Sequence, residues 1–231
     1  MPTTAPETAL TESPAQLIDH TLLKPQATGV QIETLCEEAV EWGFASVCVP
    51  PVFAPRAVDL LYGSEVAAGT VVGFPCGYET TAAKVQQTSE LVNLGCTEID
   101  MVIQVGWALA GKLDQVEEEI RQVIAAAADA RVKVILECCE LSDPLKIELA
   151  RIVARSGAAY VKTSTGFGAG GATLEDVRLL AQAVDGRIGV KAAGGIRSLE
   201  QCAGMKCAGA TRIGTSAGVE IMRQWLARQE G

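Results

Sequence analysis

The feature that most constrains the fold of this chain is a recurrence of short apolar runs, rich in valine and isoleucine, in which polar and apolar residues do not alternate. The runs cover residues 17–23, 45–49, 66–74, 98–103, 133–137, 160–163, 188–193 and 210–214. A strand with one face in solvent shows alternation, whereas a near-continuous apolar run indicates burial on both faces. The pattern therefore predicts parallel strands that helices cover on both sides.

Segments with helical periodicity separate these runs, so that strand and helix alternate along the chain. They cover residues 28–42, 81–94, 113–128, 143–155, 174–183, 199–207 and 217–228, with a weaker helical pattern at 52–61. In a chain of 231 residues this alternation predicts an α/β protein, a single-domain (β/α)8 TIM barrel, with a doubly wound open sheet as the alternative. We expect a flexible N-terminal leader at residues 1–16 and the barrel at residues 17–231.

The charge balance narrows the choice of partners. The net charge is −9, from 28 acidic and 19 basic residues, which argues against a nucleic-acid partner. The longest uncharged stretch, residues 66–78, is much shorter than the roughly 20 apolar residues that cross a bilayer. Residues 1–16 lack the basic and apolar regions of a secretory signal. We therefore expect no membrane partner and a cytoplasmic location.

The sequence offers few metal ligands. It contains one histidine, and none of its eight cysteines forms a CxxC pair. We expect no metal site and no cofactor, and a chemistry that depends on lysine, carboxylate or cysteine side chains.

Three charged residues interrupt the apolar runs. Asp100, Lys162 and Lys191 lie inside the fourth, sixth and seventh runs. A buried charge is unfavourable unless it points into a site, so we expect the three side chains to converge at the carboxyl ends of the strands, where such barrels build their sites. Two lysines in one interior lower an amine's pKa, which suits Schiff-base chemistry with a nearby carboxylate as proton carrier. A purely structural ion network is the alternative, and these residues alone do not say which lysine is the nucleophile.

Further polar residues lie within the predicted strands or at their ends. Asp19 and Thr21 end the first strand, Cys48 lies in the second and Glu137 closes the fifth. Asp19 is equally well explained as a capping or turn residue. Cys48 is better explained as a buried thiol than as a nucleophile, because free cysteine is commonly buried and no histidine is available to activate it.

Glycine-bearing turns follow the last three predicted strands. They are TGFGAGG at 165–171, GGIR at 194–197 and GTS at 214–216. Glycine lets the backbone approach an anion closely, and each turn leads into a helix whose N-terminal amides can bind that anion. We therefore expect a phosphate site at these turns, to which Arg197 could add charge, with plain strand-to-helix turns as the alternative.

The first of these turns also contains the spacing GxGxxG, formed by Gly166, Gly168 and Gly171. In a dinucleotide site this motif opens a βαβ unit and is followed by an acidic residue at the end of the next strand. Here the motif lies in the sixth unit, and Asp185 comes early and directly after a helix, so we do not expect NAD to bind.

Six short segments form a pattern of fixed order and spacing. They are IDHTLLKP at 18–25, TVVGFP at 70–75, EIDMVI at 98–103, VKTSTGFG at 161–168, VKAAGGIR at 190–197 and RIGTS at 212–216. This pattern resembles the deoxyribose-phosphate aldolases, a family of class I aldolases with the (β/α)8 fold. The resemblance implies reversible cleavage of 2-deoxy-D-ribose 5-phosphate to D-glyceraldehyde 3-phosphate and acetaldehyde, in deoxyribonucleoside catabolism. It also implies phosphosugar and aldehyde partners, and a homo-oligomer, either a dimer or a tetramer.

The resemblance implies roles for individual residues. Lys162 matches the Schiff-base lysine, Lys191 the second lysine that lowers its pKa, and Asp100 the carboxylate of the proton relay. The residues that match the family's substrate-binding positions are Asp19, Thr21, Cys48 and Thr165, and those that match its phosphate-binding positions are Gly166, Gly194, Gly195, Gly214 and Ser216.

The chain departs from the family pattern at three strand ends. Pro50 and Gln104 each stand where asparagine is usual, and Cys138 and Cys139 replace a threonine and a glycine. We expect these departures to reshape the acceptor pocket rather than to change the reaction. Two other functions fit the fold. One is a phosphosugar isomerase or epimerase, which leaves the paired lysines unexplained, and the other is a non-catalytic or functionally diverged phosphosugar-binding relative.

Overall fold

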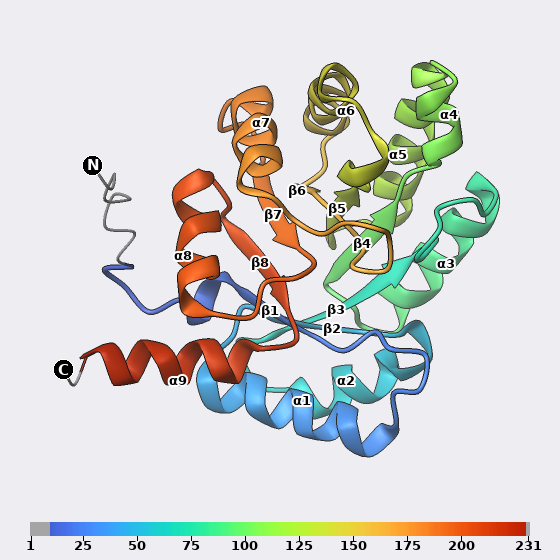
Figure 1. The fold of residues 1–231 in the computed structure, drawn as a ribbon. Coiled ribbons are helices and arrows are strands. Elements are labelled where there is room, and N and C mark those ends of the chain that lie inside the picture. The colour runs from blue at the N-terminus through green and yellow to red at the C-terminus, as the bar shows by residue number, and fades with distance from the viewer. Residues whose placement is uncertain (1–9, 230–231) are drawn as a thin grey trace, which may run out of the picture.

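The computed structural model describes residues 10–229, and within them parallel strands close into a barrel in the order β1-β2-β3-β4-β5-β6-β7-β8, with β8 paired to β1 (Figure 1). The strands are β1 (Ile18–Thr21), β2 (Ser46–Val49), β3 (Ala67–Val72), β4 (Glu98–Val102), β5 (Arg131–Ile135), β6 (Tyr160–Lys162), β7 (Gly189–Ala193) and β8 (Arg212–Thr215). The predicted TIM barrel is confirmed, and the open-sheet alternative is wrong.

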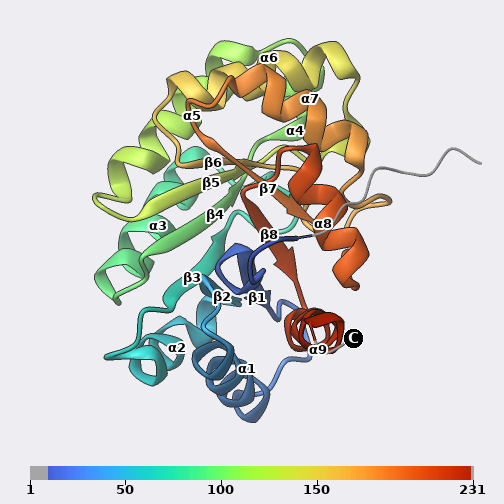
Figure 2. The ribbon, with the colours of Figure 1, turned by 90° about the vertical axis from the view of Figure 1, so that its left-hand side faces the viewer.

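Helices connect the strands and cover the outside of the barrel (Figure 2). They are α1 (Gly29–Trp42), α2 (Ala54–Leu61), α3 (Thr81–Asn93), α4 (Val105–Leu109), α5 (Leu113–Ala126), α6 (Asp143–Arg155), α7 (Leu174–Val184), α8 (Leu199–Ala208) and α9 (Gly218–Gln229). Short 3-10 helices are η1 (Ala15–Leu17), η2 (Pro51–Phe53) and η3 (Cys138–Glu140). The weak pattern at 52–61 thus forms η2 and α2, whereas α4 was not predicted.

Local sequence explains where several helices begin and end. Thr28, Thr80, Thr173 and Ser198 precede α1, α3, α7 and α8, and each side-chain oxygen accepts a hydrogen bond from the backbone amide three residues later. Each cap satisfies an amide that has no partner inside its helix. Gly43 ends α1 in the left-handed conformation, at φ 65°, which glycine adopts without a side-chain clash.

Alternate residues along each strand face two different interiors. One is the hydrophobic core between the barrel and the helices, and the other is the inside of the barrel. In β4, Ile99 and Met101 belong to the hydrophobic core, while Glu98 and Asp100, on the other face of the strand, are also buried but charged. Because successive strand residues face opposite sides, the core lies between barrel and helices, and the charged residues lie inside the barrel. The apolar runs therefore locate the strands, and their exceptions identify the barrel interior.

The segment before β1 is partly described. Residues 1–9 of the predicted leader lie outside the described residues, whereas Leu10 and Ala15 are buried in the hydrophobic core. The domain boundary at residue 17 stays a prediction. In the described part of the chain, the helices are too short or too polar to cross a membrane.

Candidate active site

The three charged residues predicted inside the strands meet in the barrel interior. Asp100 lies on β4, and Lys162 on β6 stands opposite Lys191 on β7. Asp100 Oδ2 lies 2.7 Å from Lys162 Nζ and 2.6 Å from Lys191 Nζ, and all three residues are buried. The strand register thus brings together the residues that the sequence singled out.

Further charged side chains extend this cluster. Lys133 Nζ on β5 lies 2.9 Å from Asp100 Oδ1, 3.1 Å from Asp19 Oδ2 and 2.5 Å from Glu98 Oε2. Arg212 on β8 lies 2.6 Å from Asp19 Oδ1 and 3.1 Å from Glu98 Oε2. We call this set the interior ion network, and its members are Asp19, Glu98, Asp100, Lys133, Lys162, Lys191 and Arg212.

Sequence reasoning missed three members of the network, namely Glu98, Lys133 and Arg212. Glu98 and Lys133 each stood first in a predicted run, where a charge is easily taken for the end of a strand. The structure begins β5 at Arg131, which places Lys133 in the middle of that strand. Arg212 lay inside its run, so the rule that selected Asp100 could also have selected it.

Neighbouring charges set the pKa values of most network members. Burial alone would raise the pKa of Asp19 and of Asp100, but the facing cations outweigh it and hold both values well below the usual range. Burial alone would lower the pKa of Lys133 and of Lys191, but the facing carboxylates outweigh it and raise both. These four groups are therefore charged at neutral pH.

Lys162 differs from the other two lysines. Among the described residues it forms an ion pair with Asp100 alone. Lys191 pairs with Asp100 and, at 2.5 Å, with Asp19, and Lys133 pairs with three carboxylates. Burial, assisted by the positive charge of Lys191, therefore lowers the pKa of Lys162. The geometry thus distinguishes the lysines, which the sequence alone left open, and it favours Lys162 as the neutral amine.

Lys162 also lies on the wall of a cavity of about 320 Å³ at the carboxyl ends of the strands. The other predicted residues on this wall are Thr21, Thr165, Gly166, Gly194, Gly195, Gly214 and Ser216. Lys24 and Arg197 add two cations to it. Because the cavity combines an amine of lowered pKa with glycine turns and cations, it suits an anionic carbonyl compound.

The glycine turns depend on close approach of two backbones. Gly194 has φ 93°, and its carbonyl oxygen accepts a hydrogen bond of 3.1 Å from the Ala172 amide. A Cβ on Gly171 would lie 2.3 Å from the Gly194 oxygen, which no real contact allows. Glycine at these positions therefore brings the β6–α7 and β7–α8 turns together around the cavity.

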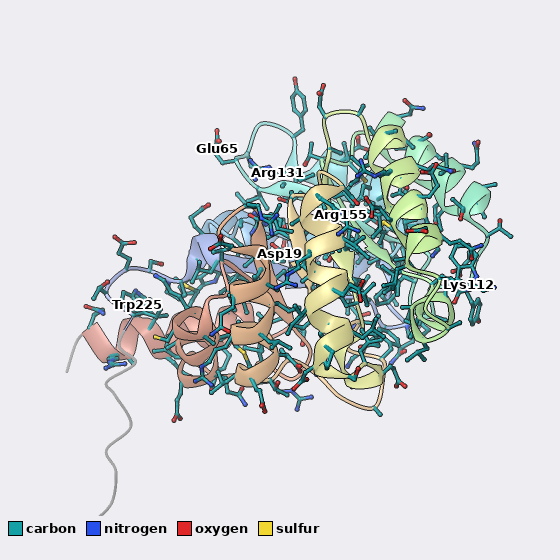
Figure 3. The ribbon with its side chains drawn as sticks, turned by 90° about the horizontal axis from the view of Figure 1, so that it is seen from above. Asp19, Glu65, Lys112, Arg131, Arg155 and Trp225 are labelled. Carbon is teal, nitrogen blue, oxygen red and sulfur yellow. The ribbon has the colours of Figure 1, made fainter. Side chains whose placement is uncertain are left out.

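Two predicted substrate residues lie behind the cavity wall rather than on it. Asp19 is fully buried in the interior ion network, and in the view of Figure 3 it lies near the middle of the molecule, whereas Lys112 lies near the edge. Cys48 is buried as well, and burial raises the pKa of its thiol to about 11. Cys48 is therefore a neutral thiol at physiological pH and a poor nucleophile, in agreement with the sequence.

The departure at Pro50 lies beside the cavity. Pro50 lines a second, smaller space of about 210 Å³ together with Val71 and Phe74. Leu23 and Phe167 line both spaces, and the rings of Phe74 and Phe167 meet edge to face with centroids 5.2 Å apart. Pro50 thus changes an apolar wall next to the main cavity.

The departure at Gln104 has a local explanation. Its side-chain oxygen accepts a hydrogen bond of 3.1 Å from the Gly106 amide and so caps α4. Among the described residues, those that line the two cavities do not include Gln104. Gln104 therefore acts as the cap of a helix and not as part of either cavity wall.

The described residues offer no group of three or more His, Cys, Asp or Glu side chains placed to hold a metal ion. His20, the single histidine, is buried and lies 2.7 Å from Glu38 through Nε2. It joins β1 to α1 and stands outside the interior ion network.

Residues 14–224, nearly the whole barrel, match the DeoC/LacD aldolases. The chain belongs to the DeoC/LacD aldolase family. A relative from Syntrophotalea carbinolica, named deoxyribose-phosphate aldolase, is 56% identical over 95% of this chain and 99% of its own length. A relative of the same name from Caldanaerobacter subterraneus subsp. tengcongensis is 51% identical over 91% of this chain and 93% of its own. The structure of a tetrameric deoxyribose phosphate aldolase from Aeropyrum pernix superposes with a TM-score of 0.87 at 33% identity, over 93% of this chain and 91% of that one.

Proposed function

We propose that this protein is a class I aldolase that reversibly cleaves 2-deoxy-D-ribose 5-phosphate to D-glyceraldehyde 3-phosphate and acetaldehyde, in deoxyribonucleoside catabolism. One observation carries the proposal: among the described residues, Lys162 is the interior lysine that both lines the cavity and has a lowered pKa. An amine of this kind forms imines with aldehydes near neutral pH. The names of relatives at 56% and 51% identity support the same substrate.

The first half of the reaction forms an imine. The neutral Nζ of Lys162 attacks the C1 aldehyde carbon of the open-chain sugar, and the resulting carbinolamine takes up a proton and loses water to give a protonated imine. Asp100, 2.7 Å from Lys162, takes and returns the protons that this step moves. Lys133 and Lys191 hold the pKa of Asp100 low, so that Asp100 passes each proton on at once and returns to its carboxylate form, and they also keep it in place. The glycine turns bind the phosphate through backbone amides, with Lys24 and Arg197 nearby.

The second half breaks the carbon–carbon bond. The C3 hydroxyl gives its proton to a water molecule, the C2–C3 bond breaks, and its electron pair moves into the protonated imine, so that glyceraldehyde 3-phosphate leaves and an enamine stays on Lys162. A proton delivered through Asp100 and a water molecule converts the enamine to the imine of acetaldehyde. Water then hydrolyses this imine, which releases acetaldehyde and restores the amine.

We also propose that the protein assembles into a homo-oligomer, a dimer or a tetramer. The relative from Aeropyrum pernix is described as tetrameric, and large apolar side chains such as Val52 and Tyr62 are exposed on this chain. Sedimentation equilibrium should give two or four times the monomer mass, and the monomer mass itself would refute this part of the proposal.

A cytoplasmic location completes the proposal. All eight cysteines lie in the described part of the chain and are free thiols there, as is usual for proteins of a reducing compartment. Fractionation of the source cells should recover the protein with cytosolic markers, and recovery with membranes or in the extracellular fraction would contradict this location.

Borohydride trapping tests the aldolase directly. The protein is mixed with 2-deoxyribose 5-phosphate or acetaldehyde, reduced with borohydride, and digested for peptide mass spectrometry. We expect one reduced adduct, on Lys162, and no adduct and no turnover in Lys162→Ala. Near-normal activity of Lys162→Ala would refute the assignment of the nucleophile, and phosphosugar binding without any adduct would favour the non-catalytic relative. Isomerised sugar without cleavage would favour the isomerase.

A further inference from the structure

Glu137 has an unusual backbone for a residue with a long side chain. It directly precedes η3 after β5, with φ 58° and ψ 66°, the left-handed region. Residues with a Cβ are disfavoured there, and such conformations persist where the surrounding structure imposes them, often at functional sites. The Glu137 residue is also only 7% exposed. The chain therefore holds a carboxylate inside the protein at a conformational cost.

The carboxylate of Glu137 is bonded to the turn that follows the lysine strand. Its Oε1 accepts a hydrogen bond of 3.3 Å from the Thr165 amide, and its Oε2 accepts one from the Thr165 hydroxyl. The Thr165 hydroxyl oxygen in turn accepts a bond of 3.0 Å from the Phe167 amide. Thr165, Gly166 and Phe167 all line the cavity, although Glu137 itself lies behind them. Glu137 thus fixes the backbone of residues 165–167 in the cavity wall through hydrogen bonds.

Packing adds to these hydrogen bonds. A Cβ on Gly168 would lie 3.1 Å from the Glu137 carboxyl carbon, and a Cβ on Gly170 would lie 2.9 Å from the Cys139 Cβ. The turn after β6 therefore lies directly against the segment 137–139. This contact explains by packing alone one glycine of the GxGxxG spacing, Gly168, and the nearby Gly170, which stands at a variable position of that spacing.

We infer that Glu137 is a positioning residue, which shapes the 165–168 turn so that its amides bind the substrate's phosphate. The inference rests on the proposed function for its substrate. Glu137 acts through Thr165 and does not itself line the cavity. It extends the site from the ends of β6, β7 and β8 to the end of β5.

The negative charge of Glu137 allows a positioning role to be distinguished from a purely electrostatic effect on phosphate binding. A carboxylate near a phosphate repels it, so if Glu137 acted through charge alone, its removal would strengthen phosphate binding. If Glu137 positions the turn, its removal weakens phosphate binding, because the hydrogen bonds of the Thr165 and Phe167 amides no longer fix the directions of the Gly166 and Gly168 amides between and beside them. The two explanations predict opposite changes in KM.

The test uses Glu137→Gln and Glu137→Gly, with Glu140→Gln as the matched control. Glycine removes the carboxylate and also relieves the left-handed backbone, so this variant should fold. Glu140 is exposed, and its Oε1 lies 3.8 Å from Cys139 Sγ. Its substitution removes the same charge from the same segment without touching the contact with Thr165.

We expect Glu137→Gly to raise KM for 2-deoxyribose 5-phosphate about tenfold, and Glu137→Gln to raise it by less. KM for unphosphorylated 2-deoxyribose and trapping of acetaldehyde on Lys162 should change less than about twofold. Amide hydrogen exchange should accelerate at residues 165 and 167 in Glu137→Gly. Glu140→Gln should match the wild type in every measurement.

An unchanged or lower KM for the phosphorylated substrate, or unchanged exchange at residues 165 and 167, would refute the positioning role. Failure of the aldolase proposal is recognised separately, because the wild type would then form no borohydride adduct. In that case exchange at residues 165 and 167, together with calorimetric binding of inorganic phosphate to wild type and Glu137→Gly, still decides whether Glu137 shapes an anion site. Equal phosphate affinity in the two proteins would refute it.

Discussion

Three lysines share one barrel interior, and the number of carboxylates around each decides whether its pKa is raised or lowered. All three are buried, which by itself disfavours the ammonium form. Lys133 has three carboxylate partners and Lys191 has two, so both have raised pKa values, whereas Lys162 has one and a lowered pKa. The lowered pKa of Lys162 therefore depends on the other interior carboxylates, Asp19 and Glu98, pairing with other cations and not with Lys162.

Substituting Lys191 with leucine should move the pH dependence of Lys162. The positive charge of Lys191 lowers the pKa of Lys162, and its removal also leaves Asp100 with one cation fewer to pair with. Both effects raise the pKa of Lys162, so less neutral amine is present at a given pH. The acidic limb of kcat/KM, and of acetaldehyde trapping, should shift to higher pH, with much lower activity at pH 7.

The control for this shift is Lys206→Leu, because Lys206 lies on α8 outside the barrel interior. Its acidic limb should coincide with that of the wild type. An acidic limb that stays in place in Lys191→Leu would show that Lys191 does not set the pKa of Lys162.

At the level of secondary-structure elements, the turns after β6 and β7 form one unit. The Ala172 amide donates to the carbonyl oxygens of Ala193 and Gly194, each at 3.1 Å, so the two turns are hydrogen-bonded to each other. The close contact leaves no room for a Cβ on Gly171. The shape of the cavity therefore depends on both turns together, and a change in one displaces the other.

Gly171→Ala should separate the two turns. Because the new Cβ meets backbone atoms rather than a flexible side chain, the turns must move, and we expect a loss of about 1–3 kcal/mol in the free energy of unfolding. KM for the phosphorylated substrate should rise more than KM for unphosphorylated 2-deoxyribose. Thermal denaturation and the two KM values measure these effects.

Gly29→Ala is the matched control, because a Cβ on Gly29 meets no atom within 4 Å. It should change neither KM, and it should not lower the melting temperature. Wild-type behaviour of Gly171→Ala would mean that close approach of the turns is unimportant for the site.

At the scale of the whole molecule, the interior ion network joins six strands across the barrel. Its members come from β1, β4, β5, β6, β7 and β8. Buried ion networks contribute little stability compared with apolar packing, but removal of one partner leaves the others uncompensated. The barrel thus keeps a charged interior that serves the chemistry of Lys162, and the hydrophobic core between barrel and helices stabilises the fold.

Lys133→Met should destabilise the whole protein, because it leaves Asp19, Glu98 and Asp100 without the cation that they share. We expect a loss of about 3–5 kcal/mol in the free energy of unfolding. The melting temperature should fall by roughly 10 °C, measured by calorimetry at pH 7. Arg56→Met removes a cation from an exposed pair with Glu33 and should cost less than about 1 kcal/mol. Equal stability of Lys133→Met and wild type would contradict the role of Lys133.

Much of this protein is determined by local sequence. Non-alternating apolar runs require burial on both faces, so the parallel strands, the intervening helices and the barrel were predictable. Asp100, Lys162 and Lys191 stood out because a charge in such a run is costly without a partner. The glycine turns were also visible, because a backbone that approaches an anion closely tends to need glycine.

Tertiary structure decided the remaining features, because they depend on distances between strands that are far apart in the chain. Strand register places Lys133 opposite Asp100 and Lys162 opposite Lys191, and these pairings determine which amine has the lowered pKa. Closure of the barrel places Asp19 beside Arg212, 193 residues away in the sequence, and so puts Asp19 behind the cavity wall. The contact between Glu137 and Thr165 likewise joins two strand ends that local sequence treats separately. Charge states and pocket walls are properties of such contacts, and periodicity alone does not encode them.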